Sequence, residues 1–187
     1  MATTRSQRIG IWIIALAMII GTVAGFVAMI LAPQNEQTDA KAQQEQMAKM
    51  MEEFKKQQLE DRKKNKPLDG YTAEAFDPAS VKELQKEVLV EGEGVEAGTD
   101  STLNVNYFGW DNTGSIFDST NREGKVEPRD LKLAQVIKGW KEGLTGLKAG
   151  TVVRLTIPAD KAYGTKDDGT GKPIGPLKFV VDIKEVK

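Results

Sequence analysis

The chain has 187 residues, with 26 lysines and arginines against 27 aspartates and glutamates, so its formal net charge is −1. That length suits one domain of ordinary size with appendages, and the balanced charge, without a nucleic-acid-binding motif, argues against a nucleic-acid partner. Cysteine and histidine are both absent. Their absence excludes disulfides, thiol nucleophiles, His-dependent triads and Cys/His metal sites, and we predict no metal.

Residues 9–31 form an apolar run without a charged residue. As a helix the run would reach ~35 Å, enough to cross a hydrocarbon core of ~30 Å. Arg5 and Arg8 precede it and acidic residues follow it, so the positive-inside rule places residues 1–8 in the cytoplasm and the rest of the chain outside. A cleaved signal peptide is the alternative. Because the run is long and lacks a small-x-small cleavage site, we predict an uncleaved single-pass anchor in the cell membrane.

Residues 34–66 are rich in Gln, Glu, Lys, Met and Ala, which favour helix. Three glutamates each precede a lysine by four residues, a spacing that stabilises helices: Glu45–Lys49, Glu52–Lys56 and Glu60–Lys64. An apolar stripe at i, i+3, i+4 and i+7 comprises Met47, Met50, Met51 and Phe54. The stripe is short for a coiled coil. We therefore predict a helical spacer, with a dimerisation helix, and hence a homodimer, as the alternative.

Pro67 should end this helix, and residues 67–82 are predicted to be a linker. From residue 83 to residue 187 the chain shows short alternating runs, typical of strands, at residues 84–90, 102–107, 152–157 and 179–186. One short helix is indicated by Ile137, Trp140 and Leu144 at i, i+3 and i+7. Together these signals predict an α+β fold, an antiparallel sheet curled around one short helix, preceded by a transmembrane helix and a helical stalk.

Two groups of motifs stand out within this region. Residues 105–110 read Val-Asn-Tyr-Phe-Gly-Trp and residues 116–119 read Ile-Phe-Asp-Ser. Residues 136–140 read Val-Ile-Lys-Gly-Trp, and residues 162–164 read Ala-Tyr-Gly. In this order and near this spacing, the region resembles the FKBP-type peptidyl-prolyl isomerases. The resemblance implies the same fold, prolyl isomerase activity without a cofactor, and proline-containing polypeptides as substrates.

The resemblance also implies a proline-sized pocket with Trp140 as its floor and Phe117 as a wall. Asp118 would face the substrate carbonyl, and Tyr163 would place its hydroxyl over the rim. The remaining lining residues would be Tyr107, Val136, Ile137, Ile174 and Val181. Taken singly, each of these side chains is compatible with a core or surface role. Their joint occurrence favours a pocket.

Prolyl isomerisation has a barrier of ~18–20 kcal/mol, which is the amide resonance lost when the C–N bond twists. Aromatic walls and one or two polar groups suffice for it. We therefore expect an isomerase that acts on exported proteins. The rim departs from the family pattern, since Arg129 or Glu127 stands where an aromatic is expected. A membrane-tethered proline-binding holdase with weak or no isomerase activity is thus one alternative, and a membrane assembly scaffold built on the Met47–Phe54 helix is another.

Overall fold

The computed structural model describes residues 36–167 and 169–187. The chain divides into two compact units, Met1–Met50 and Met51–Lys187. Across the described ranges we find no helix that combines the length and the apolar character needed to cross a membrane. The predicted span, residues 9–31, lies outside them.

Helix α2 spans Glu36–Lys63, within the region whose composition predicts a helix. It ends before Pro67 because Asn65 and Lys66 form a short strand, β1, that pairs with β5 (Asn121–Arg122). Of the predicted Glu–Lys pairs, Lys56 lies 3.0 Å from Glu52. Near the helix end the pairing shifts by one residue, so that Glu60 pairs with Lys63 and Asp61 with Lys64. Spacings of three and four residues are both adjacent on a helix surface.

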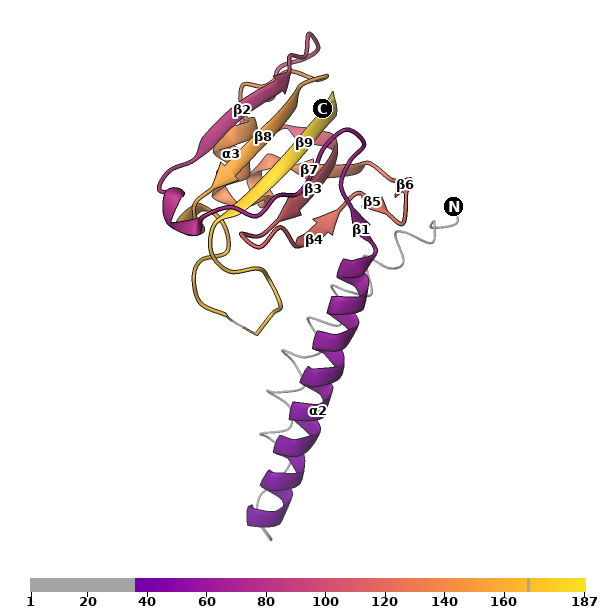
Figure 1. The fold of residues 1–187 in the computed structure, drawn as a ribbon, viewed down its shortest axis with the longest axis vertical. Coiled ribbons are helices and arrows are strands. Elements are labelled where there is room, and N and C mark those ends of the chain that lie inside the picture. Colours follow the sequence, from indigo (N-terminus) through magenta and orange to yellow (C-terminus); the bar gives the residue numbers. More distant parts are fainter. Residues whose placement is uncertain (1–35, 168) are drawn as a thin grey trace. The chain divides into compact units, whose positions relative to one another are not determined.

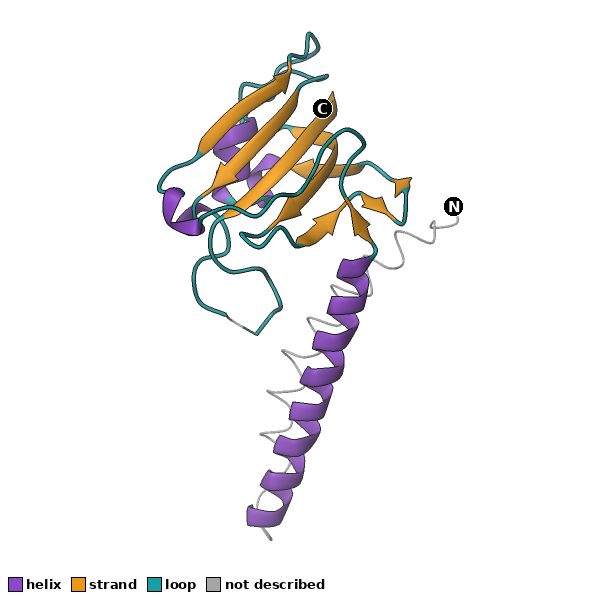
Figure 2. Cartoon of the chain, viewed as in Figure 1, coloured by secondary structure: helices purple, strands orange, loops and turns teal. Residues whose placement is uncertain are grey.

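The main sheet has the strand order β2-β8-β9-β3-β4, with β7 also paired to β3, and every pairing is antiparallel. Figures 1 and 2 show its strands side by side. Its members are β2 (Gln85–Val90), β3 (Thr102–Trp110), β4 (Ile116–Ser119), β7 (Arg129–Lys132), β8 (Val152–Ile157) and β9 (Leu177–Val186). A smaller sheet joins β1, β5 and β6 (Lys125–Val126), and three 3-10 turns are η1 (Pro78–Ser80), η2 (Leu133–Gln135) and η3 (Ala159–Lys161).

One face of the sheet packs against helix α3 (Lys138–Leu144). The contact is close because two glycines of α3 face strand β8. A Cβ built on Gly139 would lie 2.3 Å from Ile157, and one on Gly143 would lie 2.7 Å from Leu155. Trp140 and Leu144 are buried in the core between helix and sheet. The antiparallel sheet around one short helix confirms the predicted α+β fold.

The other face of the sheet is covered by the segment after β1, which was predicted to be a linker. Figure 1 shows this segment crossing the sheet. Leu68 is buried there in a second apolar cluster with Phe108 and Trp110 of β3, and Tyr71 and Phe76 pack against it. We call this group the outer cluster. Its existence explains why β3 is buried on both faces from Val105 to Trp110.

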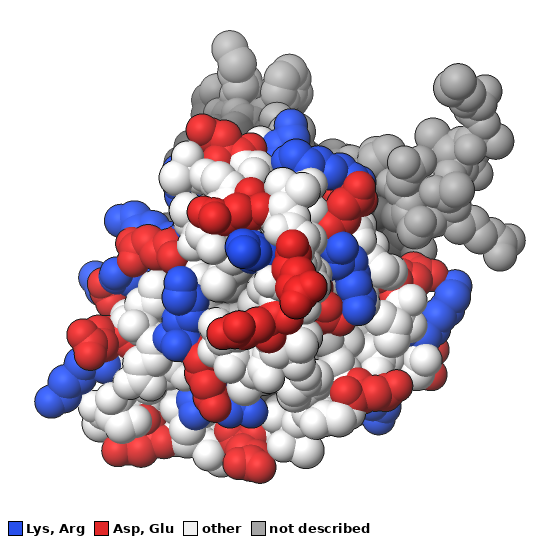
Figure 3. All heavy atoms as spheres, turned by 90° about the horizontal axis from the view of Figure 1, so that it is seen from above, with Lys and Arg blue, Asp and Glu red and all other residues white. Residues whose placement is uncertain are grey.

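Charged side chains of both signs are interspersed on the face drawn in Figure 3, and no single-sign patch covers that face. This distribution matches the near-zero net charge of the chain. It offers no extended basic surface there of the kind that binds a phosphate backbone.

Candidate functional site

Four aromatic side chains meet in edge-to-face contacts where α3, β3, β4 and β9 come together. The Trp140 ring lies 5.1 Å from that of Tyr107 and 5.3 Å from that of Phe179, centroid to centroid. Phe179 in turn lies 5.6 Å from Phe117. All three pairs are nearly perpendicular, an arrangement that aromatic quadrupoles favour. The predicted floor, the predicted wall and Tyr107 therefore belong to one aromatic cluster.

Gly109 of β3 makes room for this cluster. It is paired in register with Phe179. A Cβ at this position would lie 2.5 Å from the Phe179 ring and 2.8 Å from the Phe117 ring, distances that require the rings to move. The absence of a side chain at 109 therefore leaves space for both phenylalanine rings beside β3.

A polar network borders the aromatic cluster. The Tyr107 hydroxyl donates to Oδ2 of Asp118, and the Arg129 guanidinium donates to the Tyr107 hydroxyl oxygen over 3.0 Å. The same guanidinium lies 3.6 Å from Oδ1 of Asp118, which also accepts the Ser119 backbone N–H at 2.9 Å. Both carboxylate oxygens are thus oriented by donors. These contacts hold the Asp118 carboxylate in one orientation beside the aromatic cluster.

The Asp118 carboxylate of this network affects the pKa of both predicted tyrosines. Burial, and next the Asp118 charge, raises the pKa of the Tyr107 phenol far above its usual value. Partial burial and then the same carboxylate raise the pKa of the Tyr163 phenol. Both hydroxyls therefore remain protonated near neutral pH and can act as hydrogen-bond donors. The shared dependence on Asp118 also places Tyr163 within its electrostatic reach.

Of the other predicted lining residues, three pack with the core that contains Trp140 and one lies at a different cavity. Val136 and Ile137 are partly buried and pack against the core that contains Trp140, and Val181 is fully buried within it. Ile174 is 46% exposed and lines a cavity beside α2. No described contact joins Ile174 to the aromatic cluster.

Two residues of the aromatic cluster and its polar network were not predicted from the motifs. Phe179 of β9, two residues before the predicted lining residue Val181, contacts Trp140 and Phe117. The alternation of Phe179, Val181 and Ile183 was the available signal, since the three share one face of the strand. Arg129 was interpreted only as a replacement for a rim aromatic, whereas its guanidinium contacts Tyr107 and Asp118. The strand pairing of Val105 with Arg129 brings it there.

Comparison with known proteins identifies the family. A model of the FKBP-type peptidyl-prolyl cis-trans isomerases matches residues 94–184. The Outer membrane protein MIP of Legionella longbeachae is 33% identical over 172 residues, which cover 88% of this chain and 71% of that protein. The chain belongs to the FKBP-type peptidyl-prolyl cis-trans isomerase family. The family resemblance seen in the sequence is thereby confirmed, and the protein is an FKBP-type isomerase.

Other relatives match shorter stretches of the chain. An FK506-binding protein of Neisseria meningitidis is 40% identical over 103 residues, which cover 54% of this chain and 93% of that protein. The Peptidyl-prolyl cis-trans isomerase Mip of Coxiella burnetii is 37% identical over 107 residues, covering 56% of this chain and 45% of that one. A crystal structure of an isomerase from Pseudomonas syringae superposes with a TM-score of 0.49 at 27% identity, covering 73% of this chain and 96% of that one. The family assignment rests on the sequence relatives.

Proposed function

We propose that the FKBP-type isomerase binds the prolyl ring against Trp140, with Phe117, Phe179 and Tyr107 as walls. The edge-to-face cluster of these four rings is the observation that carries the proposal. Neither cysteine nor histidine occurs in the chain, so neither of these side chains can act as a nucleophile or base. Turnover of a prolyl peptide by the Trp140→Ala variant tests this placement.

An apolar pocket suits the reaction for a physical reason. The planar amide is stabilised by resonance that places charge on the carbonyl oxygen, and twisting the C–N bond removes that charge separation. A surface that excludes water therefore disfavours the planar amide more than the twisted one. Because only interactions that improve in the transition state accelerate the reaction, aromatic walls can catalyse it without proton transfer.

Hydrogen-bond donors are the second part of the proposed site. The Ile137 backbone N–H precedes α3 and has no acceptor among the described residues. The Tyr163 hydroxyl, on a residue 39% exposed, likewise bonds to no other group in the described part of the chain. We assign these two donors to the substrate carbonyls that flank the prolyl bond, and Asp118 to holding Tyr107 in place. Donors aimed at a polar group that moves during reaction favour its displaced position.

We further propose that the isomerase works outside the cytoplasm, anchored by residues 9–31. The charge asymmetry around this run supports an N-terminus in the cytoplasm, and a relative carries the name Outer membrane protein MIP. Exported polypeptides would then be its substrates. Protease added to intact spheroplasts should digest the isomerase domain, as it digests an external marker. Protection of the domain while the marker is cut would reverse the proposed orientation.

A homodimer through α2 is a second proposal, supported by the exposure of the methionine stripe. Met47 and Met50 are 65% and 63% exposed, and Met51 is 45% exposed. Apolar side chains aligned on one face of a helix favour pairing with a second helix. Sedimentation should give the mass of a dimer for the full chain and of a monomer once Met47, Met50 and Met51 are replaced by glutamine. Equal masses for the parent chain and the glutamine variant would indicate that the methionine stripe of α2 does not mediate dimerisation and that α2 is a spacer.

A further inference from the structure

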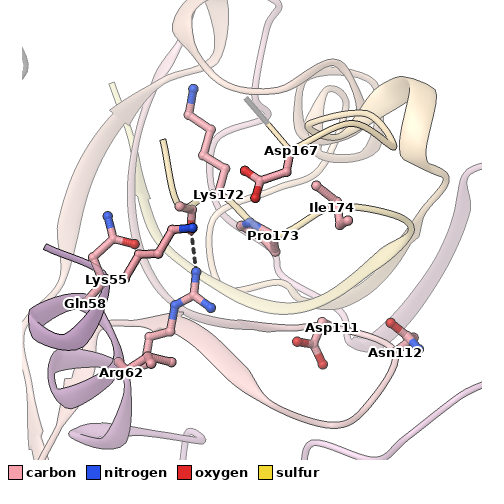
Figure 4. Close-up of a pocket in the computed structure, with 11 residues that line it drawn as sticks. Lys55, Gln58, Arg62, Asp111, Asn112, Asp167, Lys172, Pro173 and Ile174 are labelled. Carbon is pink, nitrogen blue, oxygen red and sulfur yellow. Dashed lines mark hydrogen bonds between the residues drawn. The ribbon is translucent and has the colours of Figure 1, made fainter. Parts of the chain in front are cut away.

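The last two turns of α2 bind a loop that lies far away in the sequence. Nε2 of Gln58 donates to the Thr170 carbonyl over 3.3 Å, and Nη2 of Arg62 donates to the Gly171 carbonyl. Both helix residues and both loop residues belong to the same compact unit. Figure 4 shows Gln58 and Arg62 on the helix, facing the loop that carries Lys172, Pro173 and Ile174. We call residues 170–174 the rim segment.

Apolar packing does little to hold the rim segment against α2. A cavity of about 370 Å³ lies between them, lined by residues of both. The apolar side chains on its two sides, Leu59 and Ile174, are 56% and 46% exposed. Beyond the segment, the Gly175 N–H donates to the Gly164 carbonyl over 2.8 Å and closes the base of the loop. The two side-chain bonds from α2 are thus direct contacts that hold the middle of the loop on this side.

The rim segment also reaches the proposed site. The Lys172 ammonium lies 5.9 Å from the centroid of the Tyr163 ring, within the range of a cation–π contact. Tyr163 is the phenol that we assign to the pocket rim, and Asp118 influences its pKa. A continuous set of contacts thus runs from Gln58 and Arg62, through the rim segment, to Tyr163.

We propose that Gln58 and Arg62 are positioning residues for substrate binding, because they hold the rim segment where a polypeptide substrate crosses the edge of the pocket. The proposal rests on the proposed pocket, since it takes Tyr163 as the rim. A tetrapeptide fills the aromatic cluster and reaches the two donors beside its prolyl bond. A longer chain continues past these positions, and its further residues lie over the rim segment. Gln58 and Arg62 therefore select for polypeptides over short peptides.

The test compares two substrates in the full chain. One is a tetrapeptide with a single prolyl bond, and the other is a protein whose refolding is limited by prolyl isomerisation. Combining Gln58→Ala with Arg62→Met removes both donors while Arg62→Met keeps much of the side-chain length. We expect KM for the refolding protein to rise about three- to tenfold, the size expected for losing hydrogen bonds of this kind, with kcat unchanged. Turnover of the tetrapeptide should stay at the parent value.

Two controls separate position from charge. Lys55→Met removes a positive charge from the same cavity without removing a donor to either carbonyl. It should leave KM for the refolding protein and turnover of the tetrapeptide unchanged. Arg62→Lys retains a donor and should recover much of the lost affinity. Hydrogen exchange at the amides of the rim segment should speed up in the double variant and not in Lys55→Met.

An unchanged KM for the refolding protein would overturn the proposal. So would an equal loss on both substrates, or a rise in KM produced by Lys55→Met. Peptide turnover by the Trp140→Ala variant tests the proposed pocket by itself. Each of the two proposals can therefore be contradicted without the other.

Discussion

Trp140→Ala should lower kcat/KM for a prolyl peptide by at least about tenfold, which corresponds to ~1.4 kcal/mol of transition-state stabilisation. The indole contacts Tyr107 and Phe179 at once, so its loss would open the proposed pocket to water and remove its floor. Phe117→Ala should act in the same direction by removing a wall. Asp118→Asn should have a smaller effect, because an amide oxygen can still accept from Tyr107. Protease-coupled peptide turnover measures all three.

Trp110 provides a matched control for Trp140. It is buried to a similar degree, 2% exposed against 4%, but it belongs to the outer cluster on the opposite face of the sheet. Trp110→Leu and Trp140→Leu should therefore lower the free energy of unfolding by comparable amounts, while only the second impairs turnover. Parent-like kcat/KM in folded Trp140→Leu would mean that the prolyl ring binds elsewhere.

The parts of the fold that could be predicted are those with a regular repeat. Apolar residues at every second position of β3, β8 and β9 mark the strand faces that share one core with α3, and the i, i+3, i+7 spacing of Ile137, Trp140 and Leu144 marks α3 itself. The two-residue strands β1, β5 and β6 are too short to show one. They are defined by pairings such as Lys66 with Asn121, between residues far apart in the chain.

The site shows the same division between local and distant information. Trp140, Phe117 and Tyr107, which lie in one aromatic cluster, could be predicted to lie together because they belong to short motifs. The contact of Arg129 with Tyr107 was not predicted, because it depends on the pairing of β7 with β3 and on a side chain that turns toward the phenol. No motif containing position 129 carries that information. The hydrogen bonds of Gln58 and Arg62 could not be predicted from local sequence either, because each joins residues over 100 positions apart.

The outer cluster escaped prediction for a different reason. Residues 67–77 cover the sheet as irregular chain, so Leu68, Tyr71 and Phe76 follow no helical or strand period. Their role is nevertheless visible in the contacts. The indole N–H of Trp110 donates to the Glu74 carbonyl over 3.0 Å. The Phe76 backbone N–H donates to the Asn112 backbone carbonyl over 3.0 Å, and the Lys178 ammonium lies 4.6 Å from the centroid of the Phe76 ring. The predicted linker thus contributes to the core of the isomerase unit.

A fragment of residues 83–187 should therefore be much less stable than one of residues 65–187, although the motifs of the family lie within both. Removing the segment exposes Phe108, which is fully buried, and Trp110, which is 2% exposed. Burying one large apolar side chain contributes roughly 1.5–3 kcal/mol, against a total of ~5–15 kcal/mol for a whole domain. The shorter fragment should lose most of its free energy of unfolding and bind a hydrophobic dye, as measured by urea titration and dye fluorescence.

Single substitutions in the full chain test the same idea without truncation. Leu68→Ala should lower the free energy of unfolding by roughly 2–5 kcal/mol, the range for a buried leucine, because Leu68 is only 7% exposed and packs in the outer cluster. Val95→Ala, at a position 66% exposed, should change stability little and serves as the control. Peptide turnover by the folded Leu68→Ala protein should match the parent, since the outer cluster lies on the face of the sheet away from Trp140. If the two fragments unfold at the same urea concentration and Leu68→Ala behaves like Val95→Ala, then residues 67–77 rest on the sheet without stabilising it.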